Sequence, residues 1–147
     1  MAKVKANWWT SPTESENGAL IMVTGRRDME QYIESGKYTT RIEVTWRYEG
    51  DEKGLPDKET STLMGEATDA LIEMFDKDPV AIVTGIYTGD NERNIVFYCK
   101  NMGVFERLFN KALEPFPLLP LTLYVEDDPE WNEYKEMKDL SEITEGE

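Results

Sequence analysis

Hydrophobic and polar residues alternate most regularly between Thr40 and Tyr48. Such alternation places successive side chains on opposite faces of an extended chain. One face carries Ile42, Val44, Trp46 and Tyr48, and the other carries Arg41, Glu43, Thr45 and Arg47. The pattern therefore predicts a β-strand that buries its apolar face and presents a polar one.

Two longer segments repeat their apolar residues at intervals of three and four, which is the spacing of an amphipathic helix. The first begins after Pro56-Asp57 and ends before Pro79, because the residue before a proline is pushed out of the helical region. The second begins at Asn101, a good N-cap residue, and ends at Pro115. The sequence thus predicts two helices that each bury one stripe.

Between these helices, the segments Val80–Thr88 and Arg93–Lys100 have the composition of strands, and a short polar turn joins them into a hairpin. Strict alternation along the first strand places Ile86 on one face and Tyr87, together with Val83, on the other. This strand is apolar on both faces, so we do not expect it to form an exposed sheet edge. The N-terminal hairpin or a second subunit should cover it.

The two ends of the chain carry shorter signals. Asn17-Gly18 lies between the apolar runs 6–10 and 19–24, and it accepts the backbone angles of a tight hairpin. The alternating segment Leu121–Val125 predicts a last strand. Asp128-Pro129 predicts an N-cap followed by a proline at the first helical position, which would open a short terminal helix.

From residue 38 onward, the predicted order is strand, helix, strand, strand, helix, strand. Two βαβ halves of this kind predict an α+β fold, the ferredoxin-like split βαβ antiparallel sheet with two helices on one face. Right-handed crossovers put the first and third of these strands in the middle and the other two at the edges. An N-terminal β-hairpin and a short C-terminal helix extend this core. A length of 147 residues fits a single domain, 1–147, made of a hairpin and connector (1–37), a ferredoxin-like core (38–126) and a C-terminal helix with an acidic tail (127–147).

The net charge of −14 is unevenly distributed. Residues 126–147 carry ten acidic and two basic side chains, a net charge of −8. Such a field repels phosphate backbones and anionic membrane surfaces, so we expect neither direct nucleic-acid binding nor membrane binding. A protein partner with a basic surface would be attracted, although an acidic tail can also serve solubility alone.

Several chemistries are excluded by residues that the chain lacks. It contains no histidine, so imidazole cannot act as a general base or a zinc ligand. Its one cysteine, Cys99, cannot form an internal disulfide and is predicted to be a small buried strand residue. No glycine-rich phosphate loop is present, and we expect no cofactor. The sequence has no apolar run suited to a membrane span or a signal peptide, which favours a cytoplasmic protein.

Five carboxylates gather where the last strand gives way to the last helix: Glu126, Asp127, Asp128, Glu130 and Glu133. Converging oxygens are what a divalent metal or carboxylate acid/base catalysis needs. A structural explanation competes and is favoured, with Asp128 as an N-cap and Glu130 as an acid in the first helical turn. Trp131 and Tyr134, three residues apart, would share the helix face that docks on the core.

The candidate binding residues come from the polar face of the first alternating strand and from the carboxylate run. They are Arg41, Glu43, Arg47, Asp127 and Glu130. Mixed charge of this kind fits either a solvated sheet surface or a polar binding face. No residue is predicted to be catalytic or to bind a metal.

Four short patterns mark a resemblance to a known family. They are Trp46-Arg47-Tyr48, Gly54-Leu55-Pro56, Phe97-Tyr98 and Asp128-Pro129-Glu130-Trp131-x-x-Tyr134. With these patterns, the chain from about Trp8 to Tyr134 resembles the domain of unknown function family numbered 695. Members of that family look distantly similar to the regulator of ribonuclease activity B, an acidic ferredoxin-like protein that binds and inhibits a large endoribonuclease. The resemblance implies a regulatory binding module.

Three functional hypotheses follow. The first is a small non-enzymatic protein, monomeric or homodimeric, that binds a protein partner through an acidic surface and an exposed sheet edge or face. The alternative is a carboxylate-based enzyme or divalent-metal binder that uses the cluster from Glu126 to Glu130. The third is a mimic of nucleic-acid charge that blocks a basic site on its partner.

Overall fold

The computed structural model describes residue 4 and residues 7–141, and in it six antiparallel strands form one open sheet with four helices around it. The strands are β1 (Trp8–Glu14), β2 (Leu20–Arg26), β3 (Thr40–Arg47), β4 (Ala81–Gly89), β5 (Glu92–Cys99) and β6 (Leu121–Asp127). The helices are α1 (Glu30–Glu34), α2 (Lys58–Lys77), α3 (Met102–Leu113) and α4 (Asn132–Ser141). The predicted α+β architecture, with its N-terminal hairpin and C-terminal helix, is confirmed. The acidic tail predicted beyond Ser141 lies outside the described residues.

The strand order across the sheet is β1-β2-β4-β5-β3-β6. As predicted, β3 and β5 lie in the interior and β6 lies at an edge. The doubly apolar strand β4 is covered by β2, which pairs with it from Ile21 opposite Gly89 to Gly25 opposite Gly85. The N-terminal hairpin, and not a second subunit, therefore completes this side of the sheet, and β1 becomes the second edge.

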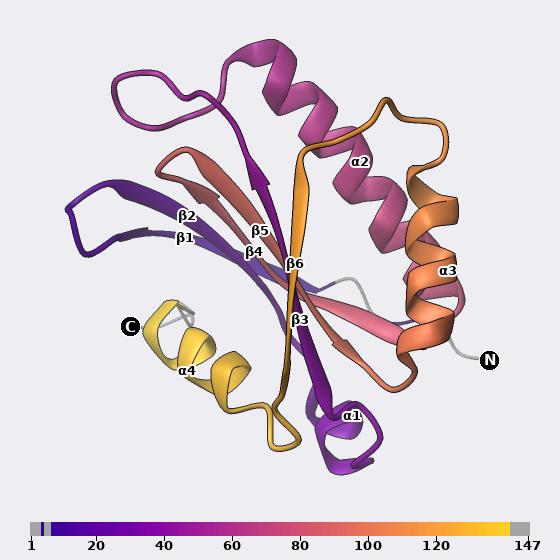
Figure 1. Cartoon of the computed structure of the whole chain (residues 1–147). Coiled ribbons are helices and arrows are strands. Elements are labelled where there is room, and N and C mark those ends of the chain that lie inside the picture. The colour runs from indigo at the N-terminus through magenta and orange to yellow at the C-terminus, as the bar shows by residue number, and fades with distance from the viewer. Residues whose placement is uncertain (1–3, 5–6, 142–147) are drawn as a thin grey trace.

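Helices α2 and α3 cover one face of the sheet (Figure 1). Their N-termini begin where the sequence predicts, since Asp57 accepts a hydrogen bond from the Thr60 N–H and Asn101 accepts one from the Val104 N–H. Phe75 of α2, Phe105 of α3 and Phe97 of β5 meet at ring-centre distances of 5.1–5.3 Å. The apolar face of β3 and the buried Cys99 belong to this side, as predicted.

Helix α4 packs on the opposite face, over the half of the sheet that contains β1 and β2 (Figure 1). A second core forms there, and its members include Trp9, Val23, Tyr98, Trp131, Tyr134 and Met137. Ser141 fastens the helix to the edge strand, because the Trp9 indole N–H donates to its hydroxyl and the Ser11 hydroxyl donates to its carbonyl. Two helices thus pack on one face of the sheet and one helix packs on the other.

A β-bulge between Val83 and Gly85 corrects the predicted faces of β4. The extra residue reverses the alternation, since one residue of shift exchanges the two faces of a strand. Ile86 therefore joins Val83 in the core under α2 and α3, while Tyr87 turns to the side of α4. The strict alternation expected from the sequence was wrong beyond Val83.

The start of α4 is also corrected. Pro129 does not open the helix, which begins at Asn132. Residues 128–131 form a turn closed by a hydrogen bond from the Trp131 N–H to the Asp128 carbonyl, and Trp131 has a left-handed backbone with φ of 58°. Asp128 still caps the helix, because its carboxylate accepts the N–H groups of Asn132 and Glu133.

A buried ion pair links the N-terminal hairpin to helix α2. The Arg26 guanidinium donates to both carboxylate oxygens of Asp76 in α2, at 3.0 and 2.8 Å. Arg26 also donates to the carbonyl of Val83, and its guanidinium lies over the Trp8 ring. Neither member of the pair was identified as special from the sequence, since a lone arginine and a helical aspartate carry no recognisable spacing.

Candidate functional site

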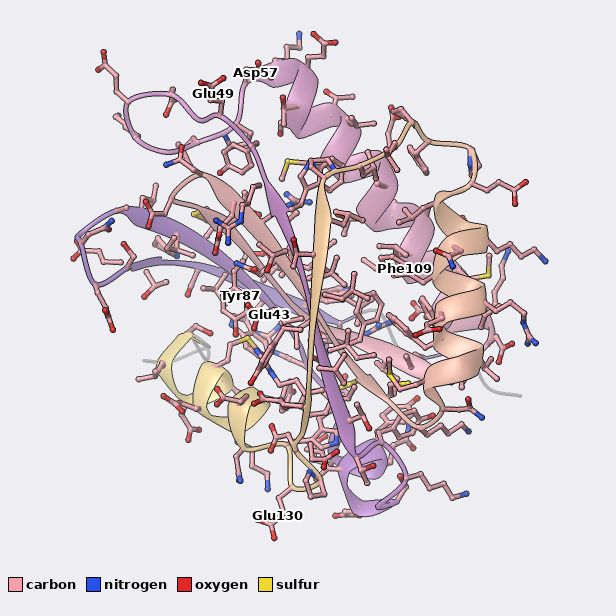
Figure 2. All side chains as sticks on the ribbon, in the orientation of Figure 1. Glu43, Glu49, Asp57, Tyr87, Phe109 and Glu130 are labelled. Carbon is pink, nitrogen blue, oxygen red and sulfur yellow. The ribbon has the colours of Figure 1, made fainter. Side chains whose placement is uncertain are left out.

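The part of the sheet that α4 leaves uncovered is hollowed into a groove, which we call the sheet groove. It has a volume of about 330 Å³ and is lined by Ser15, Ile21, Arg41, Glu43, Tyr87, Gly89, Asp90, Glu92 and Asn94. Figure 2 shows Glu43 and Tyr87 near one another at the middle of the sheet. Strand pairing brings these residues together, because the groove spans four neighbouring strands from β2 to β3.

Arg41 is the cation of the sheet groove, and two carboxylates already engage it. Its guanidinium donates to Glu126 at 3.1 Å and to Glu43 at 3.0 Å. Burial alone would lower the pKa of the guanidinium, but Glu43, Tyr98 and Glu126 raise this pKa above its ordinary value. The Arg41 Nε atom is buried and finds no hydrogen-bond acceptor among the described residues. The positive charge of Arg41 is therefore neutralised locally.

Tyr87 forms the apolar floor of the sheet groove. Burial raises the pKa of its hydroxyl to about 12, with Arg41 opposing this rise and the acids Glu43, Glu133 and Glu136 adding to it. The last two belong to α4, and they line a smaller hollow of about 190 Å³ on the other side of Tyr87. Tyr87 thus lies between two hollows whose linings both contain carboxylates.

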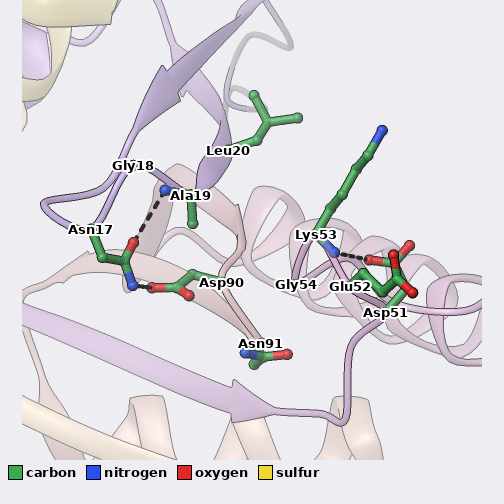
Figure 3. A pocket seen from close by; sticks show the side chains of 10 residues that line it. All are labelled: Asn17, Gly18, Ala19, Leu20, Asp51, Glu52, Lys53, Gly54, Asp90 and Asn91. Carbon is green, nitrogen blue, oxygen red and sulfur yellow. Dashed lines mark hydrogen bonds between the residues drawn. The ribbon is translucent and has the colours of Figure 1, made fainter.

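A second hollow adjoins the groove at the end of the sheet where three turns meet, and we call it the loop hollow. It is lined by residues 17–20 of the β1–β2 turn, residues 51–54 of the loop after β3 and residues 90–91 of the β4–β5 turn (Figure 3). Asp90 lines both hollows. The loop hollow adds Asp51 and Glu52 to the acidic lining and only Lys53 of opposite charge.

The structure separates the five candidate binding residues. Arg41 and Glu43 lie together in the sheet groove, whereas Arg47 lies exposed at the far end of β3. Asp127 is the exposed last residue of β6, and Glu130 is exposed in the turn before α4, where Figure 2 shows it pointing away from the molecule. Sequence reasoning missed Tyr87, Asp90 and Asn94, because their shared location depends on the bulge in β4 and on strand register.

The carboxylate run does not converge. In the part of the chain that the structure describes, no three acidic or cysteine side chains are grouped closely enough to hold a metal ion. Glu126 pairs with Arg41 on the sheet, while Asp128 points at the start of α4. The buried Asp128 carboxylate is occupied as a cap, and it also accepts a hydrogen bond from the Tyr98 hydroxyl at 2.6 Å.

The pKa of the Asp128 carboxyl is lowered. Burial alone would raise it, but hydrogen bonds from Tyr98 and from the N–H groups of Glu133 and Asn132, together with the charge of Arg41, outweigh the burial. A carboxyl whose pKa is lower in the folded state stabilises the protein above its unfolded pKa of about 3.9 and loses this effect as the pH falls.

We therefore expect the Asp128→Asn variant to be about 1–2 kcal/mol less stable than the wild type at pH 7, because asparagine can still cap the helix with one oxygen but lacks the charge and the second oxygen that accepts from Tyr98 and Glu133. This difference should shrink as the pH falls below about 4, because the wild-type carboxyl then takes up its proton. Urea unfolding at several pH values measures it. A difference that stays constant down to pH 2 would contradict the assigned role.

The residues of the four sequence patterns hold the fold together. Trp46 is buried, and the Tyr48 hydroxyl donates to the carbonyl of Gly54 in the loop after β3. Trp131 stacks on Tyr98 with ring centres 4.1 Å apart, and the Tyr134 hydroxyl donates to the Arg26 carbonyl. The residues of these patterns therefore have structural roles in the fold.

A protein-family model with the description "Family of unknown function (DUF695)" matches residues 7–137. The chain belongs to the DUF695 family. The resemblance predicted from the short patterns is thereby confirmed. A search of the curated proteins and a search of the solved structures found no match. Among its described residues, this DUF695 chain has no helix that is both long enough and apolar enough to cross a membrane.

Proposed function

We propose that this DUF695 protein is a cytoplasmic, non-enzymatic binding module that takes a basic segment of a protein partner into the sheet groove. The observation that carries the proposal is the charge of the groove lining. Glu43, Asp90 and Glu92 face it, while its one cation, Arg41, is engaged by Glu43 and Glu126. The adjoining loop hollow extends the same acidic surface.

The chemistry of the groove fits a lysine or arginine side chain. Tyr87 offers an aromatic surface, and a cation over such a ring is attracted by its electron-rich face. The surrounding carboxylates add charge pairing, and the net charge of −14 steers a basic partner toward the molecule. A cationic ligand would also compete with Arg41 for Glu43, which would tie binding to a rearrangement of this ion pair.

We also propose that residues 38–126 form a ferredoxin-like split βαβ unit. The strand order β4-β5-β3-β6 and the position of α2 and α3 between successive strand pairs support this description. Folds of this kind host many functions, so the fold does not select the ligand. Our proposal of a basic ligand therefore depends only on the charge of the groove lining.

The test is the binding of a fluorescently labelled lysine-rich peptide, followed by anisotropy at low and at high salt. We expect salt-sensitive binding that falls about tenfold or more in the triple variant Glu43→Gln/Asp90→Asn/Glu92→Gln, since several charge pairs of 0.2–1 kcal/mol are lost together. Asp90 has a φ of 52°, a conformation that asparagine tolerates, so its replacement spares the turn.

A matched control removes the same charge elsewhere. Glu66, Glu106 and Glu114 are exposed on and beside α2 and α3, which cover the face opposite the groove. Changing these three to glutamine should leave the affinity within about twofold of the wild type. Equal losses in the two triple variants would mean that only the net charge attracts the peptide, and this result would overturn the groove as the site.

A further inference from the structure

The two edges of the sheet differ in their protection. In β1, Pro12 lies within the strand and has no N–H group to offer an incoming strand, and α4 packs beside it through Ser11 and Ser141. In β6, no proline and no lysine interrupts the seven residues Leu121–Asp127. Figure 1 shows β6 as the outer strand beside β3. An unprotected edge of this length is a template for strand pairing.

The exposed side chains of β6 are largely apolar. Leu123, Tyr124 and Val125 are 40%, 55% and 46% exposed. A hollow of about 480 Å³ runs from β6 to α3. Its lining is mostly apolar and includes Phe109, Leu113, Leu121 and Leu123, while Asn110 and Glu114 are its polar members. Leu118 is fully exposed at its rim. The edge and the hollow form one apolar surface that the described residues leave uncovered.

Charge indicates what can cover this surface. Residues 115–125 contain no charged side chain, whereas the chain as a whole carries −14. Two copies of so acidic a protein repel one another wherever their carboxylates meet. The segment around β6 lets two copies approach without placing acid against acid.

We propose that β6 pairs in antiparallel fashion with β6 of a second copy, about a two-fold axis through Leu123. In this register Leu123 lies opposite its equivalent, Leu121 lies opposite Val125, and Glu126 lies opposite Pro120. Leu121, Leu123 and Val125 lie on the face of α2 and α3, because their partners on β3 are the core residues Trp46, Val44 and Ile42. A register centred on Tyr124 is worse, since it sets Asp127 against Leu121. The pairing satisfies the requirement that a two-fold interface be self-complementary.

The proposal predicts a dimer with twice the 17.0 kDa mass of the chain. Sedimentation over a concentration series should show it, and Leu123→Lys should weaken it by about tenfold or more, because two lysines then face each other at the axis. Leu140→Lys is the matched control, since Leu140 is an exposed leucine on α4, and it should leave the dimer intact. Thermal melting checks that both variants fold.

A cysteine variant tests the register. Facing residues of paired strands lie within the Cα separation that a disulfide spans. Under mild oxidation, Leu123→Cys should therefore yield a covalent dimer and Leu140→Cys should not; the native Cys99 is buried and does not interfere. Sedimentation as a monomer at every concentration would overturn the proposal. The β6 edge would then be available only to a strand of a different protein. A dimer unaffected by Leu123→Lys would overturn it as well. Neither result tests the proposed binding of a basic segment in the sheet groove.

Discussion

Replacing Trp131 with alanine is expected to destabilise the protein by about 3–5 kcal/mol, the usual cost of truncating a large buried aromatic side chain. Trp131 is 0% exposed. Its ring stacks on Tyr98, and its indole N–H donates to the Tyr38 carbonyl at 2.8 Å. Urea unfolding followed by circular dichroism measures the loss.

The backbone of Trp131 allows a sharper test. Its φ of 58° is costly for alanine and for most other residues with a β-carbon, and it is cheap for glycine. We therefore expect Trp131→Gly to be about 1 kcal/mol more stable than Trp131→Ala, the reverse of the order inside a helix. Glu130→Ala, in the exposed turn next to it, should change stability by less than about 0.5 kcal/mol. An unchanged urea unfolding midpoint for Trp131→Ala would contradict the assignment of Trp131 to the core.

Breaking the ion pair between Arg26 and Asp76 is expected to cost about 3–5 kcal/mol, because removal of one partner leaves the other charge buried. The variant Asp76→Asn does this with little change of shape. Both side chains are almost fully buried, at 0% and 4% exposure. The exposed pair between Lys77 and Glu73 offers a control, and Lys77→Ala should cost less than about 1 kcal/mol.

A double variant distinguishes the contribution of the ion pair to stability from the contribution of the contacts around it. Arg26→Met combined with Asp76→Leu removes both charges and fills their volume with apolar atoms, which is often close to neutral for buried pairs. We expect it to recover most of the stability that Asp76→Asn loses. A double variant as unstable as the single one would show that the carbonyl of Val83 and the Trp8 ring depend on the guanidinium itself.

Local patterns were sufficient to predict most elements of this fold. The alternation along β3, the helical spacing in α2 and α3, and the caps Asp57 and Asn101 depend only on neighbouring residues, and each is found where the sequence places it. The start of α4 was predicted too early, because tertiary burial holds Trp131 in a left-handed turn that no local rule favours.

The candidate site was predictable only in part. Arg41 and Glu43 were found because they lie on the polar face of a regular strand. Tyr87 was assigned to the wrong face, since a bulge inserts its extra residue without a proline or an unusual composition to announce it. The Arg26–Asp76 pair joins residues 50 positions apart, a distance over which single-sequence periodicity carries no signal.

The two faces of the sheet differ in the time at which they can be completed. The buried residues of the core under α2 and α3 all come from the chain between β3 and α3. The other face instead joins Trp9 and Ser11 to Ser141, contacts that span 132 and 130 residues. Closing so long a loop is slow, and such contacts form late in folding. On the ribosome, a nascent chain exposes Trp9, Val23 and Tyr98 until α4 has been synthesised.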